Sequence, residues 1–219
     1  MHKTVQNLLN IKTQIKTKIN ELKYNYSPKI IAISKTFSMS HIMPLIENDH
    51  INFGENKVQE AIEKWSEIKK NKKNIKLHMV GKLQTNKVKS ALEIFDYIHS
   101  LDNIKLATKI SNEQKKFINK PKIFIQINIG NEAQKSGVNK SNILDFYNTC
   151  KNLNLNIVGT MCLPPINQDP NFFFSEMKKI NKDLNLKEIS MGMSEDYMEA
   201  IKHSATYLRI GSKIFGQRS

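Results

Sequence analysis

Short apolar segments alternate with polar segments of helical pattern along almost the whole chain. Within the polar segments, apolar residues recur three or four positions apart, which is the spacing of one helix face. This alternation is typical of a parallel sheet built from strand–helix units. The predicted strands are Lys29–Ser34, Ile51–Phe53, Lys76–Val80, Tyr97–Ser100, Lys122–Asn128, Asn156–Met161, Glu188–Ser190 and Tyr207–Ile210. The helical patterns between them include Val58–Lys69, Ile104–Phe117, Ile143–Asn152, Phe172–Leu184 and Tyr197–Lys202.

Eight strand–helix units in 219 residues favour a closed (β/α)₈ barrel, or TIM barrel, in one α/β domain covering residues 1–219. An open doubly wound sheet is the alternative architecture. Turn-forming residues directly follow several predicted strands, among them Gly54, Gly81 and Gly192. Because such barrels carry their chemistry at the C-terminal ends of the strands, we look for functional residues there.

The first twenty residues contain no Asp or Glu and predict an extra N-terminal helix packed on the barrel. Its apolar positions, at helical spacing, are Val5, Leu8, Leu9, Ile11, Ile15 and Ile19. A mitochondrial transit peptide is the alternative interpretation. The segment is poor in Arg and Ser, however, and Leu22 and Tyr24 continue it without a cleavage-like site.

The chain carries 34 Lys and Arg against 20 Asp and Glu, which gives a net charge of +14. A surplus this large raises nucleic acid and anionic membranes as partners. The excess is mostly lysine scattered among Asn and Ile, as in residues 69–76, and it lacks interleaved aromatic residues. We therefore expect a solvated basic surface with no nucleic-acid and no membrane partner.

Cys150 and Cys162 have neither metal-ligand spacing nor a disulfide framework, which favours a reducing, cytoplasmic location without a bound metal. No apolar run reaches the roughly 18 residues that a membrane span needs. His78 and His99 fall on the third and fourth predicted strands, where we expect hydrogen-bonded barrel histidines and not metal ligands. We expect the other histidines, including His50, at the surface.

Lys35 follows the first predicted strand directly, after the sequence Ile-Ile-Ala-Ile-Ser. Its amine would emerge at the barrel mouth beside apolar neighbours. Partial desolvation disfavours an ammonium ion and makes the neutral amine available as a nucleophile toward an aldehyde. A rim charge without a chemical role is the alternative at this position.

The last two predicted strands end in glycine and serine. The seventh leads into Ser190–Ser194, of sequence Ser-Met-Gly-Met-Ser, and the eighth leads into Gly211 and Ser212. The loops after strands seven and eight of such barrels form a phosphate site. Ser194 is placed to cap the next helix or to bind that phosphate, and an ordinary cap with a tight glycine turn explains the same residues.

Arg209 lies within the eighth predicted strand, where an inward-facing guanidinium needs a fixed acceptor. Two partners are open at this point. One is the pyridine nitrogen of a bound ligand, and the other is a rim carboxylate such as Glu55.

Many short blocks of the sequence, in a fixed order and almost end to end, resemble one known family. They are Ala32–Thr36, Phe53–Glu60, His78–Lys87, His99–Asp102, Gln126–Ile129, Lys135–Gly137, Gly159–Met161, Ser190–Ser194 and Arg209–Gly216. The family is that of the pyridoxal 5′-phosphate (PLP) homeostasis proteins, whose fold is related to the N-terminal domain of alanine racemase.

The resemblance implies a protein of intracellular PLP, or vitamin B6, homeostasis that holds PLP as a Schiff base on Lys35. It places Asn56 at the ring side of the cofactor and Arg209 opposite the pyridine nitrogen. Met191 and Met193 have the look of a thioether pair for a soft metal, but we expect both to pack at the strand end beside the cofactor. The implied phosphate ligands are Ser194, Gly211 and Ser212.

An arginine stays cationic, so it donates to an unprotonated ring nitrogen and weakens the cofactor as an electron sink. The related racemases receive a second base from a C-terminal domain of the partner subunit, whereas this chain ends at Ser219. We therefore expect a monomeric, non-catalytic PLP carrier with PLP-dependent apoenzymes as recipients. The alternatives are a PLP-dependent amino-acid racemase that uses Tyr197 or His78 as its second base, and a nucleic-acid-binding accessory protein.

Overall fold

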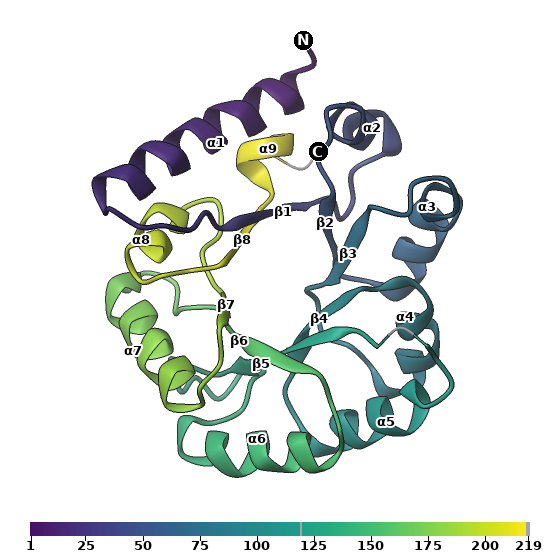
Figure 1. Ribbon diagram of the computed structural model, residues 1–219, viewed down its shortest axis with the longest axis vertical. Coiled ribbons are helices and arrows are strands. Elements are labelled where there is room, and N and C mark those ends of the chain that lie inside the picture. Colours follow the sequence, from purple (N-terminus) through teal and green to yellow (C-terminus); the bar gives the residue numbers. More distant parts are fainter. Residues whose placement is uncertain (119, 218–219) are drawn as a thin grey trace.

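Eight parallel strands close into a barrel in the computed structural model, which describes residues 1–118 and 120–217 (Figure 1). The strands pair in chain order, and β1 closes the ring by pairing with β8. In that register Ala32 is the partner of both Phe53 on β2 and Ile210 on β8. The strands are β1 (Lys29–Ile33), β2 (Asn52–Glu55), β3 (Lys76–Met79), β4 (Tyr97–Leu101), β5 (Lys122–Ile127), β6 (Ile157–Cys162), β7 (Glu188–Ser190) and β8 (Tyr207–Ile210).

The helices form a ring outside the barrel (Figure 1). They are α1 (Lys3–Glu21), α2 (Met39–Glu47), α3 (Val58–Asn71), α4 (Val88–Ile94), α5 (Ile104–Gln114), α6 (Ile143–Asn152), α7 (Pro170–Asp183), α8 (Tyr197–Lys202) and α9 (Ser212–Phe215). This architecture confirms the predicted (β/α)₈ barrel. The structure adds α2, α4 and α9 to the helices predicted from the sequence.

Alternation along the strands builds two apolar layers. On β1, Ile31 packs inside the barrel with Tyr97, Phe124, Met161 and Tyr207. The neighbouring Ile30 and Ala32 pack in the larger layer between the sheet and the helices. Successive strand residues point to opposite faces, so one short apolar strand supplies both layers.

Helix α1 covers one side of the barrel, as predicted, beside α8 and α9 (Figure 1). Its buried apolar residues are Val5, Leu8, Ile11, Ile15 and Ile19. The Asn7 side-chain amide also donates to the Ile214 carbonyl on α9 at 2.9 Å. Among the described residues, no helix combines the length and apolar character that crossing a membrane requires.

The expectations for the histidines are confirmed for His78 and His99 and wrong for His50. His78 and His99 are fully buried and hydrogen-bonded to each other inside the barrel at 3.0 Å, as predicted. His50, by contrast, is not a surface residue, because only 6% of it is exposed. It lies before β2, where its Nε2 is 2.9 Å from the carbonyl of Asn52.

Candidate functional site

A cavity of about 530 Å³ opens at the C-terminal ends of β1 and β8, beside the loop that follows β7. It brings together five of the seven residues predicted to bind the cofactor, which are Lys35, Ser194, Arg209, Gly211 and Ser212. The other lining residues are Ile33, Phe37, Met193, Glu195, Asp196, Gly216 and Gln217. Strands that are first and last in the sequence are neighbours in a closed barrel, so these distant segments meet.

A buried carboxylate, that of Glu55, binds the residue before Lys35. Glu55 ends β2 and has no exposed surface. Its Oε1 accepts hydrogen bonds from the Ser34 hydroxyl at 2.7 Å and from the Trp65 indole at 3.0 Å. The same oxygen pairs with the ammonium of Lys64, on α3, at 2.9 Å. Glu55 is therefore the partner of Lys64 and not, as one sequence interpretation allowed, of Arg209.

Lys64 extends this contact to both sides of Lys35. Its ammonium donates to the backbone carbonyls of Ser34 at 2.8 Å and Phe37 at 3.3 Å. Glu60, one helical turn earlier on α3, accepts from the Thr36 amide at 2.6 Å. Thr36 has a φ of 68°, a left-handed conformation that a β-branched residue adopts only under such constraint. Together these contacts fix the segment from which the Lys35 side chain enters the cavity.

Arg209 reaches the cavity from inside the barrel and is 4% exposed. Its Nη1 donates to the Ser190 hydroxyl at 2.7 Å, and its Nη2 donates to the Cys162 carbonyl at 2.8 Å. Burial lowers the pKa of Arg209, but a guanidinium stays protonated at neutral pH. Among the described residues, no carboxylate forms an ion pair with it. Within the described part of the chain, neutral acceptors take two of its five N–H donors.

Hydrogen-bond donors also converge at the start of α9. The hydroxyl of Ser194 accepts from the amides of Gly211 at 3.3 Å and Lys213 at 3.4 Å, which are long bonds. Gly211 has a φ of −116°, which any residue adopts. A Cβ built there would come no closer than 3.4 Å to Ile33. Neither backbone conformation nor protein packing therefore requires glycine at this position of the cavity wall.

The structure does not bring Asn56 and Met191 into this cavity. Asn56 lines another cavity, of about 320 Å³, together with Lys82, Gln126 and Lys135, among others. Met191 is fully buried in the apolar layer between sheet and helices, because it follows the inward-facing Ser190 and points to the opposite face.

Phe37 and Asp196 line the cavity but were not singled out in the sequence, whereas Met193 was expected beside the cofactor. Met193, 39% exposed, is the methionine that lines the cavity. Phe37 stacks on Phe215 with ring centroids 4.8 Å apart and so ties the β1–α2 segment to α9. Asp196 accepts from the Met193 amide at 2.6 Å, and burial raises the pKa of its carboxyl. Asp196 stands directly before α8, but its side chain makes no cap hydrogen bond to that helix, so helix-start signals in the sequence do not identify this contact.

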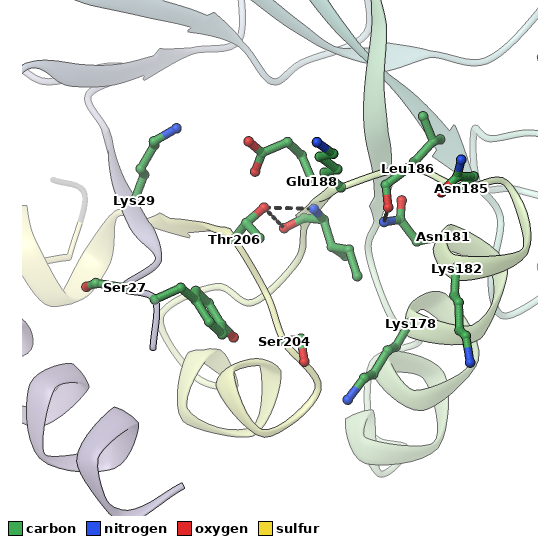
Figure 2. Close-up of a pocket in the computed structure, with 13 residues that line it drawn as sticks. Ser27, Lys29, Lys178, Asn181, Lys182, Asn185, Leu186, Glu188, Ser204 and Thr206 are labelled. Atoms are coloured by element: carbon green, nitrogen blue, oxygen red, sulfur yellow. Dashed lines mark hydrogen bonds between the residues drawn. The ribbon is translucent and has the colours of Figure 1, made fainter. Parts of the chain in front are cut away.

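A larger cavity of about 650 Å³ lies at the other end of the barrel, where β1, β7 and β8 begin (Figure 2). Figure 2 shows the amines of Lys29, Lys178 and Lys182 pointing in different directions. Polar groups on its wall are engaged in hydrogen bonds within the fold. The Thr206 hydroxyl, for example, accepts from the Ile189 amide at 2.8 Å. Size alone therefore does not identify the site, and the convergent donors lie at the opposite end.

Neither side chain considered as a second base lines the cavity of Lys35. The Tyr197 hydroxyl donates to the Gln14 side chain on α1. His78 has no exposed surface, and its ring nitrogens contact His99 and Asn52.

Comparison with known proteins places the chain among relatives of one kind. Residues 8–219 match the family model described as alanine racemase, N-terminal domain. The chain is 34% identical to the pyridoxal phosphate homeostasis protein of Pasteurella multocida, over 97% of each chain. It is also 34% identical to the protein of that name from Haemophilus influenzae, over 98% of this chain and 96% of the relative.

Solved structures agree with this relationship. PipY of Synechococcus elongatus, known without PLP and with PLP bound, is 29% identical, with TM-scores of 0.82 and 0.80. In both cases the match covers 92% of this chain and all of that one. Alanine racemase of Clostridium difficile shares the fold, with a TM-score of 0.69 at 14% identity, and the match covers 56% of its chain.

Proposed function

Because the chain belongs to the pyridoxal phosphate homeostasis proteins, we propose that it binds PLP in the cavity of Lys35 and holds it as a carrier. The observation that carries this proposal is the convergence of three kinds of group on one cavity. They are the amine of Lys35, a half-buried residue that follows β1, a buried guanidinium from β8, and backbone amides at the start of α9.

The start of α9 fits a phosphate. Ser194, Gly211 and Ser212 offer a hydroxyl and backbone amides on one wall, and the missing side chain of Gly211 leaves room for close approach to the backbone. The Ser194 hydroxyl accepts from the amides of Gly211 and Lys213 over long distances, so a phosphate oxygen would compete for donors that are weakly engaged.

Lys35 and Arg209, which line the same cavity, fit a pyridine ring and an aldehyde. Bound PLP supplies an aldehyde that an amine attacks to form a Schiff base. Lys35 would provide that amine, since the contacts of Glu55 and Lys64 direct its segment into the cavity. Arg209 would donate to the ring nitrogen with an N–H that Ser190 and Cys162 do not use, and it would keep that nitrogen unprotonated.

A carrier explains the site better than a racemase does. An unprotonated ring nitrogen lowers the acidity of a substrate α-proton. Tyr197 and His78 are bonded elsewhere, so the cavity lacks both bases that were considered. The exposed side chains of Glu195 and Gln217 at the rim leave the cofactor reachable, as transfer to apoenzymes requires. We propose further that residues 1–219 act as one PLP-binding domain, as a monomer, in the cytoplasm.

Borohydride reduction of the PLP-loaded protein tests the site, because it converts an imine into a stable amine. Peptide mass mapping should recover the cofactor mass on Lys35. The variant Lys35→Ala should lose that mass but keep weaker PLP binding in equilibrium dialysis, since other segments provide the phosphate contacts. Lys178→Ala, at the far end of the barrel, serves as the control and should behave as wild type. Recovery of the mass on another lysine would refute the assignment.

A second measurement tests the absence of turnover. Incubation of the loaded protein with D- and L-amino acids in deuterated water should leave their α-protons unexchanged by NMR. Exchange at a rate typical of enzymes, roughly 1 s⁻¹ or faster, would favour the racemase instead.

A further inference from the structure

A continuous chain of side-chain hydrogen bonds runs through the barrel interior to Arg209. The Ser190 hydroxyl receives Nη1 of Arg209 at 2.7 Å and lies 2.9 Å from Nδ1 of His99. Nε2 of His99 is 3.0 Å from Nδ1 of His78, and Nε2 of His78 is 3.1 Å from Oδ1, the side-chain oxygen of Asn52. We call Ser190, His99, His78 and Asn52 the interior chain. It begins at the first residue of β2 and crosses β3, β4 and β7 to β8.

The chemistry of the two ends gives the interior chain a direction. A guanidinium only donates, so the Ser190 oxygen accepts from Arg209 and its own proton is left for Nδ1 of His99. At the other end, the Asn52 oxygen accepts from Nε2–H of His78. Both imidazoles are then Nε2–H tautomers, and Nε2–H of His99 donates to Nδ1 of His78. If each hydrogen bond between these side chains ran the other way, the Ser190 oxygen would receive two donors. The Ser190 proton would then have no acceptor within the interior chain.

The interior chain also has a defined charge. Burial lowers the pKa of His78 and of His99 well below the ordinary value, and the cationic Lys29 and Arg209 lower them further. Both rings are therefore neutral at physiological pH. Each ring stacks on an aromatic neighbour at a centroid distance of 4.2 Å, His78 on Tyr97 and His99 on Phe124. The rings cannot turn without losing these contacts and their hydrogen bonds.

A neutral chain does what a carboxylate could not do in its place. A carboxylate beside Arg209 would fix the guanidinium but compensate its charge. The Ser190 hydroxyl fixes Nη1 only while its proton is committed to His99, since a hydroxyl without an acceptor rotates. Because His99 and His78 supply that acceptor, Arg209 keeps a fixed orientation and its full charge for a ligand in the cavity.

We propose that Ser190, His99 and His78 are positioning residues that hold the Arg209 guanidinium in one orientation toward the cavity. The orientation itself stands on the contacts above. Its use, to present an N–H to a ring nitrogen, rests on the proposed PLP function.

Nitrogen NMR of the protein without PLP tests the orientation, and the chain contains only two arginines, Arg209 and Arg218. With ¹⁵N-labelled arginine, we expect separate, slowly exchanging Nη signals for Arg209. The variant His99→Phe keeps an aromatic ring against Phe124 but removes the acceptor, so these signals should exchange faster and merge. His99→Gln restores an acceptor oxygen and should recover them in part. His203→Phe, outside the interior chain, should leave them unchanged.

Labelled histidine in the wild-type protein provides a readout that needs no substitution. Nitrogen shifts should show His78 and His99 as neutral Nε2–H tautomers that do not titrate between pH 8 and pH 5, while free histidine in the same tube does. An Nδ1–H tautomer at either residue, or Arg209 signals unaffected in His99→Phe, would overturn the proposal.

The PLP-bound state then separates this proposal from the proposed function. His99→Phe should still be trapped by borohydride on Lys35, with PLP affinity about tenfold lower, as expected for one weakened hydrogen bond. Unchanged affinity would show that the orientation of Arg209 is not used for the ring. Failure of the wild-type protein to bind PLP would refute the proposed function, while the NMR result would still decide the role of the interior chain.

Discussion

Arg209 brings a full positive charge into the barrel, and neutral groups receive its two hydrogen bonds there. Removing a guanidinium from water is costly unless its donors are satisfied. Ser190 and the Cys162 carbonyl satisfy two of them, and the rest of the group lines the cavity. A buried cation held in this way is a feature of a binding site, because packing alone favours an apolar residue.

A substitution at Gly211 tests the proposed phosphate contacts at the start of α9. Its φ suits alanine, and a Cβ would meet Ile33 only at van der Waals distance, so Gly211→Ala should leave the free energy of unfolding within about 1 kcal/mol of wild type. The same methyl group would crowd a phosphate, and PLP affinity should fall about tenfold or more. Urea unfolding and equilibrium dialysis measure the two effects.

Gly159→Ala is the contrasting control. A Cβ at Gly159 would lie 1.9 Å from the carbonyl oxygen of Glu188 on the paired strand, so this change should destabilise the protein by about 3 kcal/mol. If Gly211→Ala bound PLP as wild type does, the ligand would not approach that backbone.

At the scale of elements, the segment after β1 depends on α3. Lys64→Met removes the ammonium from fully buried Glu55 and from the carbonyls of Ser34 and Phe37. Loss of one partner from a buried ion pair should lower the free energy of unfolding by about 3 kcal/mol. It should also slow borohydride-trappable capture of PLP by Lys35. Urea unfolding and timed trapping test the two expectations.

A double-mutant cycle with Glu55→Gln identifies the cause. The double variant should be more stable than the sum of the single effects implies, by about 1 kcal/mol or more. Lys69→Met is the matched control, since Lys69 and Asp96 form a partly exposed pair and should contribute about 1 kcal/mol at most. Additive effects of Lys64→Met and Glu55→Gln would contradict the role of the ion pair.

The strands were predictable because their apolar runs are distinct. All eight lie within two residues of the expected bounds, since β-branched and aromatic residues fill segments flanked by turn residues. The missed helices carry weak local signals. Pro44 lies inside α2, and α9 spans four residues. Their stability comes from packing, which a single sequence does not display.

The site was predictable as a set of strand ends and less so in its contacts. The family resemblance placed Lys35 and Arg209 on one cofactor, and in the structure they line one cavity because β1 and β8 are adjacent in the closed barrel. The burial of Met191 follows from the inward direction of Ser190, and fixing that alternation needs the barrel register. The pairing of Glu55 with Lys64 depends on how α3 packs, so sequence left Glu55 open as a partner of Arg209.

At the scale of the whole molecule, buried histidines link stability to pH. His50, His78 and His99 all sit in the folded protein with lowered pKa values. For His50, burial and then the charge of Lys12 lower the pKa to about 4. In the unfolded chain each imidazole has a pKa of about 6.5. Between these values the unfolded state binds more protons, so acid favours unfolding.

We therefore expect full histidine-linked stability above about pH 7 and a progressive loss as the pH falls through about 6.5 toward 4. His50 alone should cost about 2 kcal/mol of the free energy of unfolding at pH 5, and His78 and His99 add losses of the same sign.

Urea unfolding of the protein without PLP, between pH 7.5 and pH 5, measures the slope of the free energy of unfolding against pH. Carboxylates titrate mainly below this window, so most of the slope should come from protons that the histidines take up on unfolding, and it should exceed the slope that His50 alone would give. His50→Phe should reduce that uptake by about one proton and leave the contributions of His78 and His99, because His50 contacts the backbone carbonyl of Asn52 whereas His78 contacts its side-chain oxygen. A free energy of unfolding that stayed constant from pH 7.5 to pH 5 would mean that these imidazoles take up protons in place, and the neutral interior chain behind Arg209 would then have to be abandoned.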